Sequence, residues 1–147
     1  MKKYNLFKNL LIAIILTTSV SVFGQDKIIP YSEVPAQIQT YIAKHFPNTQ
    51  VLHAEVDYEG LTKEYEIILN DSTKLEFDYK NNIVSIKANS KLPDSTIPTK
   101  IREYVKANYP KNYIIEWELD KTNQSVDLDN KIELEFSRKG DFLRIDN

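Results

Sequence analysis

The chain has 147 residues, of which 41% are hydrophobic and 27% are charged, and its formal net charge at pH 7 is −2. This composition is typical of a globular protein and argues against a disordered one. The sequence contains no cysteine, which excludes disulfides, thiolate metal ligands, a cysteine nucleophile and a lipid anchor attached through cysteine. A net acidic chain is also a poor candidate for nucleic-acid binding, which depends on lysine and arginine.

Residues 1–24 predict a secretory signal peptide. Three lysines accompany an apolar segment, and the small residue Gly24 precedes the expected cleavage site. The alternative is a membrane anchor, but the dense apolar run of residues 10–16 is much shorter than the about 20 residues that span a bilayer. Cleavage leaves residues 25–147, which suffice for one domain. We therefore expect a periplasmic or secreted protein that has no membrane association after cleavage.

Two matching segments predict two helices. Residues 34–47 (VPAQIQTYIAKHFP) align without a gap with residues 97–110 (IPTKIREYVKANYP). Each segment has one apolar stripe at helical spacing. Ser32 and Ser95 lie just upstream as candidate N-caps, and the proline after the last aromatic residue ends each helix.

The segment after each helix predicts a strand with alternating side chains. Residues 49–58 (TQVLHAEVDY) and 113–120 (YIIEWELD) show this pattern. The alternation places one set of apolar side chains towards the core: Leu52, Ala54, Val56, Ile115, Trp117 and Leu119. Trp117, the sole tryptophan, is therefore predicted to lie in the core, and the alternative is an exposed binding hot spot.

Each half closes on a similar hairpin. Residues 75–86 (LEFDYKNNIVSI) match residues 134–145 (LEFSRKGDFLRI), with Asn81 and Gly140 at the turns. Both residue types tolerate the left-handed conformation of a tight hairpin. We predict an α+β fold of two tandem repeats, each one helix followed by about four antiparallel strands, with the helices packed on one face of the sheet. Repeat one spans about residues 30–90 and repeat two about residues 91–147.

The helices ending in FP or YP, the pattern YEI.L.....LEFD...N and the closing KIELEFSRKGDFLRIDN resemble the PepSY-like family of exported Gram-negative bacterial proteins. The resemblance covers nearly all of the chain after the predicted signal peptide. It implies two repeats and a fold similar to that of β-lactamase-inhibitor protein. The likeness to β-lactamase-inhibitor protein also implies that the sheet can bind a protein, and the related domains in propeptides of secreted metallopeptidases imply an inhibitory or regulatory role. It supplies no catalytic residues.

Residues that carry enzyme or metal chemistry are sparse. His45 and His53, without any cysteine, give little support for a zinc site. Residues 127–132 (DLDNKI) begin like a calcium loop, but Lys131 stands where a ligand is needed and Ile132 where glycine is needed. No phosphate-binding loop and no hydrolase motif is present. We therefore predict no enzymatic activity and no cofactor.

The tripeptide DST occurs twice, at residues 71–73 and 94–96. In some Gram-negative envelopes such a tripeptide is an acceptor for O-glycosylation, which would fall on Ser72 or Ser95. The alternative is structural, with a hairpin turn at the first position and a helix cap at the second.

The outward face of the predicted sheet is rich in carboxylates, because alternation points these side chains away from the helices. Apolar side chains are expected to be scattered among them: Val51, Ile68, Ile83, Ile114 and Phe142. We take the following acids as the candidate interaction surface: Glu76, Glu116, Glu118, Asp120, Asp127, Asp129, Glu133 and Glu135.

This surface predicts a monomeric protein-binding or inhibitory module that attracts a basic protein partner. One alternative is a cation- or small-ligand-binding envelope sensor that uses the same carboxylates. Another is an ordinary solvated face, whose acids discourage edge-to-edge aggregation. A glycosidase with paired carboxylates is the least favoured, since a single small sheet predicts no cleft.

Overall fold

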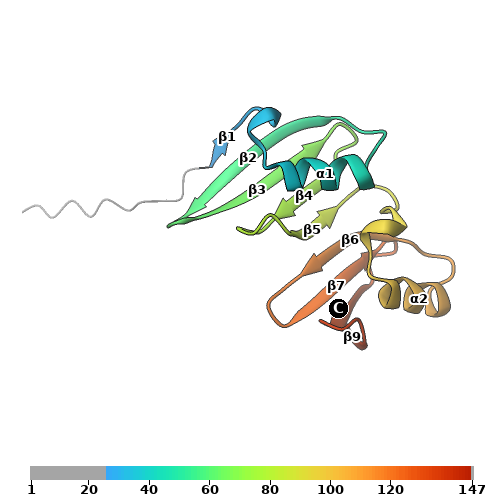
Figure 1. Cartoon of the computed structure of the whole chain (residues 1–147). Helices are drawn as coiled ribbons and strands as arrows, with labels where there is room; N and C mark the ends of the chain where they lie inside the picture. Colours follow the sequence, from blue (N-terminus) through green and yellow to red (C-terminus); the bar gives the residue numbers. More distant parts are fainter. Residues whose placement is uncertain (1–25, 147) are drawn as a thin grey trace, which may run out of the picture.

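A computed structural model describes residues 26–146 of the chain (Figure 1). The predicted signal peptide lies outside the described residues. In chain order the strands (β), α-helices (α) and 3₁₀ helices (η) are β1 (Lys27–Ile28), η1 (Tyr31–Glu33), α1 (Ala36–His45), β2 (Val51–Glu59), β3 (Thr62–Leu69), β4 (Lys74–Phe77), β5 (Ile83–Lys87), η2 (Asp94–Thr96), α2 (Thr99–Asn108), β6 (Ile114–Leu119), β7 (Asn123–Leu128), β8 (Glu133–Ser137) and β9 (Phe142–Asp146).

The strands of the described residues form one nine-stranded antiparallel sheet in sequential order, β1 to β9. The two halves join where β5 pairs with β6 through Ser85–Glu118, Ile86–Trp117 and Lys87–Glu116. The predicted α+β class is therefore confirmed, and the repeats share one sheet. The first half has five strands and the second has four. The prediction of about four strands in each repeat did not include β1, which is only two residues long.

The helices begin and end at matching places in the two repeats. Pro35 precedes α1 and Pro98 precedes α2, and neither helix has a side-chain hydrogen bond at its N-cap. Ser32 and Ser95 lie instead in the 3₁₀ helices η1 and η2. The prediction that these serines cap the α-helices is therefore wrong, because each repeat inserts a short 3₁₀ turn before the proline.

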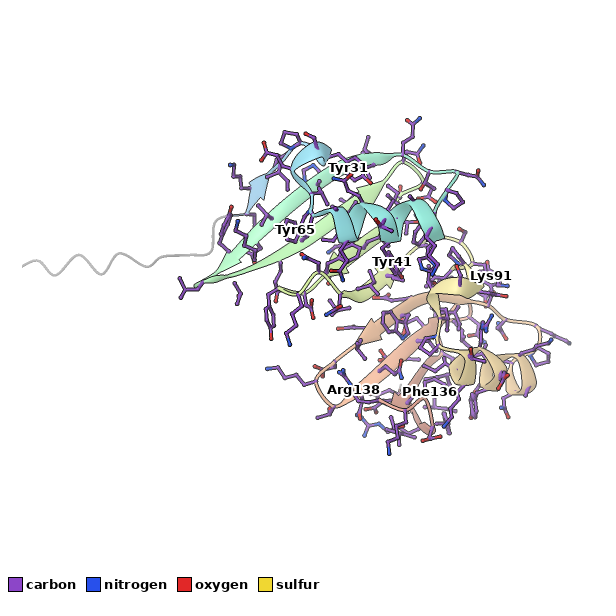
Figure 2. All side chains as sticks on the ribbon, in the orientation of Figure 1. Tyr31, Tyr41, Tyr65, Lys91, Phe136 and Arg138 are labelled. Atoms are coloured by element: carbon purple, nitrogen blue, oxygen red, sulfur yellow. The ribbon has the colours of Figure 1, made fainter. Side chains whose placement is uncertain are left out.

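Both helices pack on the same face of the sheet, which places the core between them and the strands (Figure 2). The Tyr41 ring of α1 meets Phe77 of β4 edge-on, with centroids 5.6 Å apart, and Tyr104 of α2 meets Phe136 of β8 at 5.4 Å. The two phenylalanines are at most 1% exposed. Trp117 is 5% exposed, which confirms the prediction that it is a core residue.

Strands β2 and β6 each carry a β-bulge near their start. The pairing register skips Leu52 after Val51 and skips Ile115 after Ile114. One extra residue moves the preceding side chain to the other face of the sheet. Val51 therefore packs against the core and Ile114 is buried, whereas Leu52 is 73% exposed. The prediction that Leu52 faces the core and that Val51 and Ile114 face outwards is wrong for this reason.

Strands β5 and β9 carry a second pair of matching bulges. The register skips Val84 in β5 and Leu143 in β9. Ile83 consequently packs against the core, and the Phe142 ring stacks on Tyr104 with centroids 4.5 Å apart. The prediction that Ile83 and Phe142 face outwards is therefore also wrong.

The hairpin turns contain the left-handed residues that the sequence predicts. The φ angle is 64° at Asn81 and 84° at Gly140. The preceding turns of the two repeats use Ser72 and Lys131, each with φ of 68°. Left-handed conformations at matching positions show that the two repeats have the same turn geometry even where neither carries glycine.

The two DST segments differ in structure. In the first, the Asp71 carboxylate accepts a hydrogen bond from the backbone N–H two residues later at 2.9 Å, so the predicted turn is confirmed. The second forms η2 rather than a cap of α2, and its Ser95 hydroxyl lies 2.9 Å from Nδ1 of His45 at the end of α1. This contact links the two repeats. Both serines are exposed, and O-glycosylation at Ser72 or Ser95 stays a prediction.

Candidate interaction surface

We call the face of the sheet that points away from both helices the open face. Because the strands pair in register, its side chains form rows that run across the sheet. The central row crosses all nine strands and five of its nine members are glutamates: Ile28, Glu55, Glu66, Glu76, Ser85, Glu118, Ser125, Glu135 and Arg144.

A neighbouring row differs in charge between its two halves. In the first repeat it contains His53, Ile68, Lys74 and Lys87. In the second repeat it continues through residues that are all acidic: Glu116, Asp127, Glu133 and Asp146. We call these four residues the acidic row. The fold alone does not require carboxylates here, since the matching positions of the first repeat carry none.

Two members of the acidic row have cationic partners. Lys87 Nζ lies 2.6 Å from Glu116 Oε2, and Arg144 Nη2 lies 3.5 Å from Asp146 Oδ2. The two central members, Asp127 and Glu133, face each other across β7 and β8. Within residues 26–146 neither of these two makes an ion pair, so the centre of the row carries adjacent uncompensated carboxylates.

The surroundings of these central carboxylates disfavour their charged forms. Burial raises the pKa of Asp127, and the charge of Glu116 raises it further while Lys87 opposes the shift. Burial also raises the pKa of Glu133, with added contributions from Asp127 and Asp146. A proton or another positive charge on this surface is therefore favourable.

Neutralising both residues, as Asp127→Asn/Glu133→Gln, is expected to stabilise the protein at neutral pH. Like charges opposed on neighbouring strands cost roughly 0.2–1 kcal/mol per pair, which the variant removes. Because the folded-state pKa values are raised, the wild-type folded state takes up protons before the unfolded state as pH falls, and it gains stability. The advantage of the variant should therefore shrink on acidification and vanish below the ordinary values of 3.8 for Asp127 and 4.5 for Glu133.

Urea unfolding in steps from neutral pH to about pH 3 measures this difference in the free energy of unfolding. The control is Glu33→Gln/Glu103→Gln, which removes the same charge from two exposed residues outside the sheet and should show no comparable pH-dependent gain. An advantage that grows as the pH falls would contradict the proposed repulsion.

The remaining acids of the predicted surface on this face are partly neutralised. Lys74 Nζ lies 2.7 Å from Glu76 and 2.8 Å from Glu66. Arg144 Nε lies 2.6 Å from Glu135. Glu118 is exposed in the central row between two serines. The structure therefore brings six of the eight predicted residues onto the open face: Glu76, Glu116, Glu118, Asp127, Glu133 and Glu135.

Asp120 and Asp129 lie beyond the ends of β6 and β7 instead. The Asp129 carboxylate accepts hydrogen bonds from the Asn112 side chain at 2.9 Å and from the Tyr113 N–H at 3.1 Å, which lower its pKa. It holds the loop between α2 and β6 in place. Both residues follow the last residue of a strand, so strand alternation alone does not fix the face on which they lie, and their place in the interaction surface stays a prediction.

The first repeat contains an acidic hollow of about 300 Å³, and of the carboxylates that line it only Glu76 belongs to the predicted interaction surface. Six carboxylates line it: Asp26, Glu55, Asp57, Glu64, Glu66 and Glu76. The charge of Asp57 is the largest cause that raises the pKa of Asp26, followed by burial and by the charge of Glu55. Asp26 carries no signal in the sequence, because β1, which follows it, is only two residues long and shows no alternation.

The two histidines lie apart. His45 contacts Ser95, whereas His53 Nε2 lies 3.0 Å from Glu55 Oε2 on the open face. Among the residues that the structure describes, no group of three or more histidine, aspartate or glutamate side chains is arranged to hold a metal ion. The carboxylates of the acidic row in particular are spread over four strands rather than gathered around one point.

Comparison with known proteins identifies the family. The sequence matches the family model described as "Putative beta-lactamase-inhibitor-like, PepSY-like" over residues 21–85 and 63–144. The chain belongs to the PepSY-like family. The two overlapping matches agree with the two repeats of the structure, so the resemblance noted from the sequence is confirmed.

Three solved structures are similar to this PepSY-like protein. One is a "putative calcium-regulated periplasmic protein" from Bacteroides thetaiotaomicron, at 35% identity and a TM-score of 0.78, covering 83% of this chain and 97% of that one. The second is a "putative periplasmic protein from DUF2874 family" from Bacteroides vulgatus, at 33% identity and a TM-score of 0.79, covering 84% and 98%. The third, also from B. vulgatus, is a "putative periplasmic protein of unknown function" at 28% identity and a TM-score of 0.78, covering 84% and 100%. Among curated proteins none matches.

All three of these similar proteins are described as periplasmic. Across residues 26–146 of this PepSY-like protein, no helix has the length and apolar character needed to cross a membrane. The expected signal peptide falls on residues that the structure does not describe.

Proposed function

We propose that this PepSY-like protein is an exported, non-enzymatic module that binds a basic protein partner through its open face. The observation that carries the proposal is the acidic row, whose central residues Asp127 and Glu133 have raised pKa values and no ion pair in the described chain. A basic segment lying across β6 to β9 would supply the missing positive charge and relieve the repulsion between these carboxylates.

The contrast between the repeats supports a binding role over an ordinary solvated face. The acids are confined to the second half of the row, where they oppose one another across neighbouring strands at a cost in stability. In the first half, Lys74 bridges Glu66 and Glu76 and so neutralises neighbouring acids. Uncompensated charge that destabilises the folded chain is typical of a surface used for recognition.

The test is capture of a partner by the immobilised protein from a periplasmic extract. The wild type should retain a partner whose binding weakens as salt is added. The variant Asp127→Asn/Glu133→Gln should lose it, whereas the control Glu33→Gln/Glu103→Gln should retain it. Because the first variant is expected to be more stable than the wild type, its loss of capture cannot come from unfolding. Unchanged capture by this variant would refute the surface assignment.

A cation-binding role is the second candidate. It is supported by the acidic hollow around Asp57 and by the similarity to the B. thetaiotaomicron protein, which is described as calcium-regulated. Calorimetric titration with Ca²⁺ tests it, since a true site saturates at a defined stoichiometry. Asp57→Asn should abolish that saturation, and a wild type that shows no saturable heat would exclude this role.

The proposal includes export and a single binding domain. We propose a signal peptide at residues 1–24 that is removed and a monomeric PepSY-like domain over residues 25–147, free of the membrane. Two repeats, about residues 30–90 and 91–147, would make up this domain. The mass of the protein isolated from the periplasm, which should correspond to a chain beginning at Gln25, tests this processing.

A further inference from the structure

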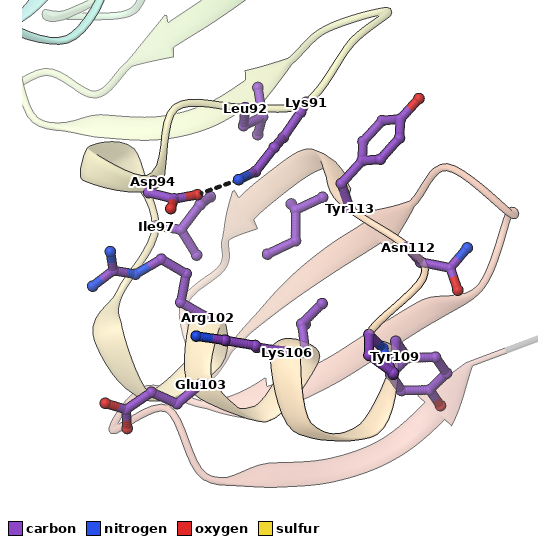
Figure 3. A pocket seen from close by; sticks show the side chains of 13 residues that line it. Lys91, Leu92, Asp94, Ile97, Arg102, Glu103, Lys106, Tyr109, Asn112 and Tyr113 are labelled. Carbon is purple, nitrogen blue, oxygen red and sulfur yellow. Dashed lines mark ion pairs between the residues drawn. The ribbon is translucent and has the colours of Figure 1, made fainter.

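A cavity of about 500 Å³ lies on the second repeat between α2, the segment before it and the loop between α2 and β6 (Figure 3). It is separate from the open face, because α2 packs on the opposite face of the sheet. Its volume is in the range of sites that bind small molecules. Buried apolar side chains form its floor, among them Leu92, Ile97, Val105 and Ile114.

Three cationic side chains lie around this floor: Lys91, Arg102 and Lys106. Figure 3 shows them on the same side of the cavity as Asp94, with Tyr113 and Asn112 on the other side. We call the cavity with these three cations the cationic groove. It is a local concentration of positive charge on a chain that is acidic overall.

The cations are incompletely neutralised by the protein itself. Lys91 Nζ lies 2.9 Å from Asp94 Oδ1, and this hydrogen bond, with the charges of Arg102 and Lys106, lowers the pKa of Asp94. Arg102 donates one hydrogen bond to Thr99 Oγ1 at 3.3 Å, while its Nε is buried without a hydrogen-bond partner. Lys106 has no ion pair within residues 26–146.

One further acid lines the groove. Glu103 is exposed, and Figure 3 shows its carboxylate pointing away from the cavity. The groove therefore has three cationic and two acidic side chains, and of the acids only Asp94 points towards the cations. The guanidinium of Arg102 and the ammonium of Lys106 are left available to an anion.

The first repeat contains the matching cavity without these charges. Its volume is about 430 Å³, and the residues that line it include Ile42, Ala43 and Phe46. Ala43 stands where the second repeat has Lys106, and Gln39 stands where it has Arg102. Both repeats therefore form a groove of this shape, and the three cations of the second repeat are not needed to build it.

We propose that the cationic groove binds a small organic anion that carries a planar ring. Arg102 and Lys106 would hold the acid group through charge-assisted hydrogen bonds, for which the fork of an arginine is well suited. The ring would lie on the apolar floor beside Tyr113, which is 39% exposed. This inference is independent of the proposed function, since it uses neither the open face nor its acids.

Calorimetric titration with phenyl phosphate, which combines a ring with a dianion, tests the proposal. The wild type should bind it at one site. The variant Arg102→Gln/Lys106→Ala, which gives the groove the residues of the first repeat, should bind it at least about tenfold more weakly, because it loses the charge-assisted hydrogen bonds of both cations. Lys106→Ala alone is a second variant that removes one cation and should give a smaller loss.

Two further ligands and one control variant complete the experiment. Inorganic phosphate has the charge without the ring and phenol has the ring without the charge, so both should bind more weakly than phenyl phosphate. Lys44→Ala removes an exposed cation from α1 and should leave binding unchanged. Equal binding by the wild type and the double variant, or no saturable binding by the wild type, would overturn the proposal. Inorganic phosphate that binds as tightly as phenyl phosphate would overturn the assignment of a ring.

Discussion

Replacing Phe136 with alanine is expected to lower the free energy of unfolding by about 3–5 kcal/mol. The Phe136 side chain is fully buried, and its ring meets Tyr104 and Phe142 edge-on at 5.4 Å and 5.8 Å. Alanine would leave a cavity between β8 and α2 that the surrounding backbone cannot fill. Urea unfolding followed by circular dichroism measures the loss.

The matching substitution in the first repeat is Phe77→Ala. Phe77 is 1% exposed and meets Tyr41 at 5.6 Å, so a similar loss of about 3–5 kcal/mol is expected. Because one sheet runs through both repeats, each variant should shift a single unfolding transition of the whole chain. Phe142→Ala is the control, since that ring is 36% exposed and its removal should cost much less. Two separate transitions, each moved by only one of the two variants, would show that the repeats unfold independently.

Replacing Gln124 with leucine is expected to cost about 1–3 kcal/mol, although leucine has a similar size and is apolar. Gln124 is 4% exposed and its Oε1 accepts a hydrogen bond from Trp117 Nε1 at 3.0 Å. Its Nε2 donates to the carbonyl oxygens of Ser137 at 3.0 Å and Arg138 at 3.3 Å, at the end of β8. Leucine would leave the buried indole N–H without an acceptor, and this desolvation penalty is the main cost.

A double-mutant cycle separates this hydrogen bond from simple packing. Trp117→Phe removes the donor and leaves Gln124 Oε1 without its partner, so this variant is also destabilised. In Trp117→Phe/Gln124→Leu both partners are gone, and the total loss should be smaller than the sum of the two single losses. Additive losses in urea unfolding would mean that the hydrogen bond contributes nothing beyond the packing of the two side chains.

The repeats, helices and hairpins were predictable because their signals are local. Apolar residues at helical spacing such as Ile38 and Ile42 define the buried stripe of α1, and prolines bound the helix. Asn81 and Gly140 mark the closing turns by their tolerance of positive φ. Each of these features depends on a few neighbouring residues, and the gap-free match between the two helices shows that the chain is a duplication.

The errors came from features that depend on the partner strand. Period-two alternation continues through Leu52 and Ile115 in the sequence, and only the pairing register shows that each is an extra residue. For the same reason the sequence pointed to acids on the open face but did not show that four of them form one row. Its members come from four strands, so their alignment depends on every register between Glu116 and Asp146.

The cationic groove could not be predicted from the sequence for a different reason. Arg102 and Lys106 on α2 have the pattern of an ordinary solvated helix face. Lys91 is distant from them in sequence, and only the fold brings the three cations to one cavity. A position-by-position comparison of the two repeats, with Gln39 and Ala43 as the counterparts on α1, was the one sequence signal that could have found the difference.

The four bulges establish an order of events in the history of this protein. Leu52 and Ile115 occupy matching places in the two repeats, as do Val84 and Leu143. The extra residues were therefore present in the single ancestral unit before it was copied, together with the turns and the shape of the groove. The positions of the acidic row and of the groove cations differ between the copies, so at least one copy has changed at these positions since the copying. The shared framework therefore predates the copying, and both proposed binding features lie at positions where the two copies have since diverged.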